Sequence, residues 1–181
     1  VMKTILRILP VLLLIAGLSG CSAQKPAVGT GHRGAGPDAL SGGGPEALYG
    51  QALKALDERR FVIEAAEFYL PKGGSPVKSP SGSYISMQGN KGIICFSRNV
   101  FPCETWKRLN IEDDTAEITE MEPKKNGDRQ FFIKIVGPQK GEEREIILTL
   151  YRNTNKCFAR VNYYRSSHLF DFIGYVYPAG E

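Results

Sequence analysis

The chain has 181 residues, of which 42% are hydrophobic and 23% charged, and its formal net charge is +4. Its length suits one folded domain with an appended segment. Lys3 and Arg7 carry two of the four net charges and residues 22–44 carry a third, so the remainder is nearly neutral and lacks the concentrated basic face that nucleic-acid binding requires.

Residues 1–20 predict a bacterial lipoprotein signal peptide. Two basic residues precede an apolar run over residues 8–18, and Ser19 and Gly20 stand directly before Cys21. A bilayer-spanning helix needs roughly 20 apolar residues, so an uncleaved membrane anchor is the weaker alternative. A lipid-free secretory signal is a second alternative. We expect cleavage between Gly20 and Cys21, a diacylglycerol thioether on the Cys21 sulfur and a further fatty acyl chain such as palmitate on its amine.

The residues after Cys21 bear on location. Residues 22–25 contain neither an Asp beside Cys21, which retains many Gram-negative lipoproteins at the inner membrane, nor a run of acids resembling a surface-export tag. We therefore expect a cell-envelope protein, lipid-anchored in the periplasmic leaflet of the outer membrane.

Residues 21–44 predict a lipidated cysteine followed by a flexible tether. Residues 22–44 contain seven glycines and two prolines and almost no large apolar side chain, so they cannot offset their ordering entropy by burial. Their root-mean-square reach is about 25–30 Å. The stretch from Gly29 to Gly34 fits G-x-G-x-x-G, but no strand precedes it and no helix follows, so we interpret it as accidental and His32 within it as a solvated residue.

Residues 45–181 predict a single β-rich domain that begins with a short helix. Pro45 and Glu46 suit a first helical turn, and an apolar stripe follows at helical spacing, formed by Tyr49, Ala52, Leu53 and Leu56. Arg59 and Arg60 place cations at the end of this helix. We expect the apolar stripe to pack against the sheet that follows.

From Phe61 onward the hydrophobic period is 2, which is typical of strands. A hairpin is predicted at Gly89-Asn90-Lys91, and further turn signals recur along the chain. The alternation predicts one dry face, formed by Phe131, Ile133, Ile135, Ile146, Leu148, Leu150, Cys157, Ala159, Val161, Tyr163, Phe170, Phe172 and Val176. The opposite, wet face is predicted to carry Lys134, Glu145, Thr149, Arg160, Asn162 and Asp171. The sequence therefore predicts an all-β antiparallel meander of about eight strands closing as a small barrel, with a sandwich as the alternative.

Cysteine chemistry beyond Cys21 is left open by the sequence. Cys95, Cys103 and Cys157 allow at most one internal disulfide, such as Cys95–Cys103 or Cys95–Cys157, while the simpler interpretation is buried free thiols. The sequence contains no C-x-x-C or H-x-x-x-H spacing. We predict neither a metal site nor a cofactor.

Two candidate chemical sites are weak. Ser166 or Ser167 could be combined with His168 and Asp171 as a hydrolase constellation, but neighbouring positions in one turn rarely converge on a substrate. The acidic run at Glu112-Asp113-Asp114, with Glu117, Glu120 and Glu122, lacks a calcium-loop pattern and indicates a solvated strand edge. We predict no catalytic residue.

A ligand mouth is a further hypothesis, since aromatic rings with polar tips often line the open ends of barrels. The residues predicted to gather there are Trp106, Tyr163, Tyr164, Tyr175 and Tyr177.

Several stretches resemble the domain-of-unknown-function family numbered 4251, whose members are lipoproteins of Gram-negative anaerobes. They are Phe61 to Ala65, Pro71 to Ser75, Tyr84 to Lys91, Leu148 to Tyr151 and Asn155 to Ala159, and the resemblance spans Ala47 to Pro178. It implies an all-β envelope domain and no activity. Residues 102–108 depart from the pattern, because the family tends to carry a Gly-rich segment with aromatic residues there.

These observations predict a non-enzymatic envelope protein attached to the membrane through Cys21. It would bind a small apolar or sugar ligand, or a protein partner. The alternative is a structural or assembly lipoprotein with a packed, ligand-free core, and a hydrolase is the weakest hypothesis. Oligomeric state is not indicated by the sequence.

Overall fold

The computed structural model describes residues 44–71, 73–101, 109–137, 143–163 and 167–180. All of them lie in one compact unit, residues 39–181. The signal peptide, Cys21 and the tether predicted over residues 1–43 lie outside the described residues.

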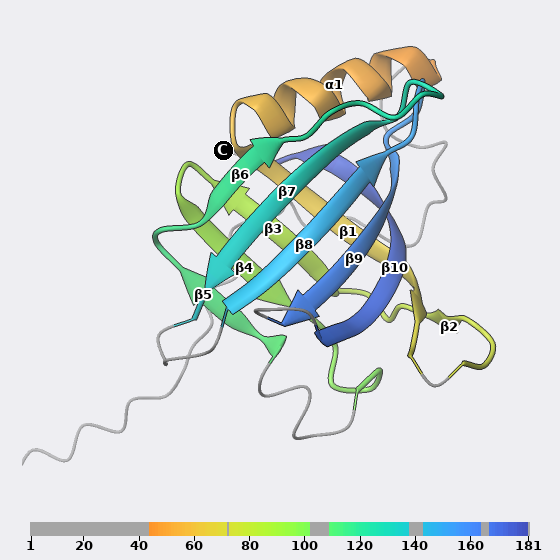
Figure 1. The fold of residues 1–181 in the computed structure, drawn as a ribbon, viewed down its shortest axis with the longest axis vertical. Coiled ribbons are helices and arrows are strands. Elements are labelled where there is room, and N and C mark those ends of the chain that lie inside the picture. Colours follow the sequence, from red (N-terminus) through yellow and green to blue (C-terminus); the bar gives the residue numbers. More distant parts are fainter. Residues whose placement is uncertain (1–43, 72, 102–108, 138–142, 164–166, 181) are drawn as a thin grey trace, which may run out of the picture. The chain divides into compact units, whose positions relative to one another are not determined.

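In the described part of the chain, helix α1 is followed by ten strands, whose arrangement is drawn in Figure 1. The elements are α1 (Pro45–Asp57), β1 (Arg60–Tyr69), β2 (Val77–Lys78), β3 (Tyr84–Gln88), β4 (Lys91–Cys95), β5 (Ile111–Asp113), β6 (Glu117–Glu120), β7 (Arg129–Val136), β8 (Glu143–Leu150), β9 (Lys156–Tyr163) and β10 (Ser167–Pro178).

The strands form one curled antiparallel sheet, ordered β5-β4-β3-β1-β10-β9-β8-β7-β6, with the short β2 paired to β1. Strands β3 to β5 and strands β6 to β10 each pair with their neighbours in sequence, and the last strand, β10, returns to pair with the first, β1. The sheet therefore curls into a half-barrel whose two end strands, β5 and β6, follow one another directly in the chain. The predicted antiparallel all-β fold is confirmed, and the sandwich alternative is wrong because all of these strands belong to one sheet.

The concave side of the sheet is the hydrophobic core. Strands β7 to β10 bury the residues that the alternation assigned to the dry face, including Ile133, Leu148, Ala159 and Phe172. One assignment to the wet face is wrong. Thr149 is 3% exposed, and its hydroxyl accepts a hydrogen bond from Gln130 Nε2 at 3.2 Å. The Gln130 side chain, on the neighbouring strand β7, covers the Thr149 hydroxyl. Thr149 is therefore buried, although its place in the alternation puts it on the outer face of the sheet.

Five phenylalanines fill the end of the half-barrel opposite α1. Phe68 packs edge-on against Phe96, Phe101 and Phe170, with ring centroids 5.3 to 5.7 Å apart. Phe172 completes the cluster. Phe68 reaches the interior because β1 carries a register shift between Ala65 and Glu67, which reverses the alternation that Phe61 and Ile63 begin.

Helix α1 lies across the other end of the sheet (Figure 1). Pro45 occupies the first turn, where its missing N–H costs nothing, and Glu46 complements the helix dipole. The buried residues Ala52, Ala55 and Leu56 pack into the core against β1 and β10. The predicted docking of the helix is confirmed, although Ala55 was not assigned to the buried face. The described residues include no helix with the length and apolar character needed to cross a membrane.

We expect the substitution Phe68→Ala to lower the free energy of unfolding by about 3–5 kcal/mol, because it removes the ring at the centre of the aromatic cluster and leaves a cavity. Urea denaturation followed by circular dichroism measures this change. The control is Leu70→Ala, since Leu70 is 37% exposed and its truncation should cost less than about 0.5 kcal/mol. Equal losses in the two variants would contradict the assignment of Phe68 to the core.

Candidate functional site

The candidate site lies where the two ends of the curled sheet meet. Strand β5 pairs with β4, and β6 pairs with β7, so residues 111–120 connect the first half of the sheet to the second. The chain bends between these strands at residues 114–116. We call this region the seam, defined as the bend together with the strand ends beside it.

The Asp113 carboxylate holds the bend. Its Oδ1 accepts hydrogen bonds from the Thr115 N–H and the Thr115 hydroxyl, both at 2.8 Å. This local pairing replaces strand hydrogen bonds and turns the chain. Its Oδ2 accepts the N–H of Val136, the last residue of β7, also at 2.8 Å. One side chain therefore shapes the bend and ties β5 to β7.

Asp113 has a lowered pKa. Its burial opposes ionisation and would by itself raise the pKa. The hydrogen bonds donated by Val136 and Thr115 favour the carboxylate and outweigh that effect. Asp113 is thus a structural anion, which corrects the expectation that the whole acidic run is a solvated edge. No group of three or more His, Cys, Asp or Glu residues in the described part of the chain could hold a metal ion.

Gly92 allows the two sides of the seam to approach each other. A Cβ on this residue would lie 2.6 Å from the Ala116 Cβ and 3.1 Å from the Ile135 Cγ1. The Ala116 N–H donates a hydrogen bond of 2.7 Å to the carbonyl of Asn90, at the tip of the β3–β4 hairpin. The hairpin therefore closes against the start of β6.

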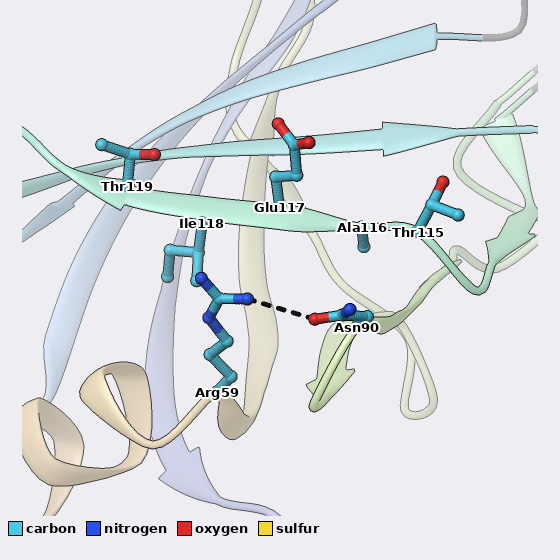
Figure 2. Close-up of a pocket in the computed structure, with 7 residues that line it drawn as sticks. All are labelled: Arg59, Asn90, Thr115, Ala116, Glu117, Ile118 and Thr119. Carbon is cyan, nitrogen blue, oxygen red and sulfur yellow. Dashed lines mark hydrogen bonds between the residues drawn. The ribbon is translucent and has the colours of Figure 1, made fainter.

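Beyond this contact β6 separates from the hairpin and leaves an open groove of about 380 Å³ (Figure 2). We call it the seam groove. It is lined by Arg59, Asn90 and residues 115–119. Figure 2 shows the Arg59 guanidinium below the β6 backbone, beside Ile118 and Asn90, while the Glu117 and Thr119 side chains point away from it.

Arg59 is held in place by both its backbone and its side chain. Its φ of 55° is the left-handed conformation that commonly ends a helix but is unusual for a residue other than glycine. The Arg59 N–H donates to the Leu56 carbonyl at 3.1 Å, and its own carbonyl accepts the Gly89 N–H at 2.8 Å. The Arg59 Nη1 donates to Asn90 Oδ1 at 3.1 Å. The helix end and the hairpin tip thus fix one cation in the groove.

The predicted ligand mouth falls only partly on the described residues. Tyr175 and Tyr177 alternate with the buried Val176, so they lie on the outer face of β10. Tyr163 pairs with Ser167, eight residues from Tyr175 along β10, which is about 25 Å in a strand. The backbone of Tyr163 is thus far along β10 from Tyr175, and the shared mouth stays a prediction. Trp106 and Tyr164 lie outside the described residues.

The other predicted groups are placed as follows. Asp171 accepts two hydrogen bonds from Arg160, at 3.0 and 3.1 Å, on the outer face. Cys157 is buried and Cys95 half-buried, and both are free thiols, so the suggested Cys95–Cys157 bridge is wrong. Ser166 and Cys103 lie outside the described residues, as do the side chains of Ser167 and His168.

Arg144 is a buried charge that the sequence reasoning missed. It is 1% exposed and shares the inward phase of Ile146 and Leu148 on β8. Its Nη1 donates to the Glu143 carbonyl at 3.0 Å. Continuing the alternation back from Ile146 by two residues would have placed Arg144 on the dry face. Arg59 and Asp113 were also missed, because their roles depend on contacts between distant segments.

The chain therefore belongs to the class of all-β domains built from a single curled antiparallel sheet. A helix lies across one end of this sheet, and a bend in the chain joins the two end strands. A crystal structure of a DUF4251 family protein from Bacteroides eggerthii shares this fold, with a TM-score of 0.59 over 74% of this chain and 89% of that one, at 21% identity. This likeness supports the family resemblance found in the sequence. No family model and no curated protein sequence matches the chain.

We expect Asp113→Asn to lower the free energy of unfolding by about 1–3 kcal/mol, because an amide cannot accept all three hydrogen bonds and leaves a buried donor unsatisfied. In the unmodified protein, the contribution of Asp113 should be complete above the ordinary aspartate pKa of about 4 and should disappear as pH falls through the lower pKa of the folded state. Chemical denaturation between pH 2 and 7 measures both effects.

The matched control is Asp114→Asn, since Asp114 is the exposed neighbour. We expect little change in its unfolding free energy and an unaltered dependence on pH. If Asp113→Asn kept the full acid-dependent loss of the unmodified protein, the assigned role of Asp113 would be wrong.

Proposed function

We propose that this protein is a lipid-anchored, non-catalytic protein of the bacterial cell envelope, whose β-domain is a packed scaffold that binds a protein partner on its outer surface. The observation that carries this proposal is the contrast between a filled interior and an open seam groove.

The filled interior argues against a small ligand held within the curled sheet. A ligand site of this kind needs a cavity of about 300–1,000 Å³. In the described residues, side chains from α1 and from strands on all sides form one buried cluster, and Phe68, Phe96 and Phe101 occupy the end away from the helix. The seam groove and a second hollow of about 330 Å³, between α1 and the end of β10, both open at the surface. Contacts with another protein suit such a scaffold better.

The chemistry of the described side chains supports a non-catalytic role. Burial raises the pKa of the Cys157 thiol to about 12, so it stays protonated and is a poor nucleophile. The Asp171 carboxylate, the acid of the hydrolase hypothesis, is engaged by Arg160 on the outer face. Neither group has the activated environment that covalent or acid–base catalysis requires.

The anchor in this proposal is Cys21, modified after removal of residues 1–20, and the site of attachment is the periplasmic leaflet of the outer membrane. The predicted tether would hold the domain about 25–30 Å from the membrane surface. That distance would let the domain reach other proteins of the envelope while it remains at the bilayer.

We expect Cys21→Ser to move the protein from the membrane fraction to the soluble fraction and to abolish incorporation of labelled palmitate, because the thioether and the processing that follows it require the thiol. Fractionation of the native host, with Ser22→Ala as the matched control, measures this. An unchanged membrane fraction for Cys21→Ser would refute lipid anchoring.

The partner is tested separately with a photo-crosslinking amino acid in the native host. Placed at Thr119, whose side chain lies on the outer face of β6 beside the seam groove, it should yield a discrete protein adduct upon irradiation, because this position is exposed next to the open edge of β6. The control site is Arg152, which is exposed in the turn between β8 and β9. Failure to form any adduct at Thr119 above that at Arg152 would count against a partner at this surface.

A further inference from the structure

Strand β6 directs part of its backbone away from the sheet. It is an end strand, and the N–H of Met121, the residue after it, donates to the carbonyl of Gln130 in β7 at 2.8 Å. The Ala116 N–H points the opposite way, to Asn90. Since neighbouring residues of a strand direct their N–H and C=O groups to alternate sides, Ile118 and Glu120 direct theirs away from β7, to the side of β6 on which the seam groove lies. No described strand pairs with this edge.

The hairpin tip closes one end of this edge. The Ala116 N–H lies on the same edge of β6 and is already bonded to the Asn90 carbonyl. A strand added along this edge therefore cannot continue past Ala116. A segment pairing antiparallel to β6 would enter beside Glu120 and reach the hairpin tip with its carboxyl end. The geometry therefore favours a segment whose chain ends at this point.

Arg59 supplies a positive charge at that end. A guanidinium carries five N–H donors in a planar fork that suits a carboxylate, and the described residues engage one of them, through Asn90. The left-handed backbone of Arg59 and its contact with Gly89 fix the base of the side chain. Figure 2 shows this guanidinium between the β6 edge and Asn90, where the end of an added strand would lie.

We propose that the seam groove binds the C-terminal end of an extended peptide, which pairs with the free edge of β6 and places its terminal carboxylate on Arg59. This inference rests on the proposed function and specifies the kind of partner. The added strand supplies main-chain hydrogen bonds to Ile118 and Glu120, and the carboxylate selects a chain end over an internal segment. On the outer face, the exposed Glu117 favours a lysine or arginine opposite it.

The competing explanation is protective. Short end strands with charged residues prevent sheets from pairing edge to edge, and both Glu117 and Arg59 could serve that purpose. This explanation requires that no extended peptide binds, whereas the proposal requires binding that depends on the free carboxylate. The two therefore differ in a direct measurement.

The probe is a pool of fluorescein-labelled heptapeptides, varied at their last four positions among Val, Ile, Thr and Lys, with either a free or an amidated C-terminus. Fluorescence anisotropy with the full acylated protein in detergent micelles should show binding of the free-acid pool and roughly tenfold weaker binding of the amidated pool, since one charge-assisted pair is lost. Arg59→Gln should bring the free-acid pool to the level of the amide. Arg60→Gln, at the neighbouring exposed arginine, should leave binding unchanged.

Amide spectra of the isotope-labelled protein provide a readout that does not depend on a variant folding correctly. The Ile118 and Glu120 resonances should shift and become protected from exchange when the free-acid pool is added. Equal binding of the two pools, no binding of either, or unchanged Ile118 and Glu120 resonances would overturn the inference.

The failure of this inference can be distinguished from failure of the proposed function. If the Thr119 adduct forms equally in the unmodified protein and in Arg59→Gln, the protein binds a partner at this surface, but Arg59 does not select a carboxyl end. If the unmodified protein forms no adduct above the control site, the proposed function fails as well.

Discussion

The closure of the sheet depends on the Asp113 carboxylate. A single sheet of this length has two end strands, and its ends must be brought together for the concave face to become an enclosed core. Here the chain itself passes from one end to the other through the bend after β5. The carboxylate satisfies two donors within the bend and the terminal N–H of β7, so the backbone groups released by bending do not remain unpaired.

This closure accounts for the single buried core that the described residues form. With β5 held to β7, the hairpin of β3 and β4 lies close enough to contact Ala116 and Ile135, and glycine at position 92 is the residue that permits this distance. The helix covers one end of the core and the phenylalanine cluster fills the other. The described side chains thus form one continuous buried cluster on the concave side of the sheet.

The same closure leaves one edge exposed. Strand β6 extends beyond the hairpin that would otherwise cover it, so the groove is a consequence of two segments of unequal length meeting at the seam. Elsewhere the outer face is stabilised by cross-strand charge pairs, including Arg160 with Asp171 and Lys134 with Glu143. Such exposed pairs contribute little to stability and indicate a solvated surface. The seam groove differs from these surfaces because it combines free backbone groups with a fixed guanidinium.

The sequence alone determined the first helix and the buried face of strands β7 to β10. The period-2 alternation from Phe131 to Val176 predicted the buried face of four strands. Successive side chains of a strand point to opposite faces, so a strand buried on one face has a hydrophobic residue at every second position. Proline and glutamate marked the start of the helix for a similarly local reason. The signal peptide predicted over residues 1–20 also rests on a short local pattern.

Only the tertiary structure decided how the ends of the sheet meet and what lies there. The shift in β1 that turns Phe68 inward arises against β10, where Gly174 allows the two backbones to cross closely. Tyr175 and Tyr163 were expected at one end, but their separation depends on strand register, which the alternation of side chains does not specify. Asp113, Asn90 and Arg59 come from three separate parts of the chain and acquire their roles only after long-range pairing brings them together. No local pattern of residues could have indicated the seam groove, because its geometry depends on the difference in length between strands that meet from opposite ends of the sheet.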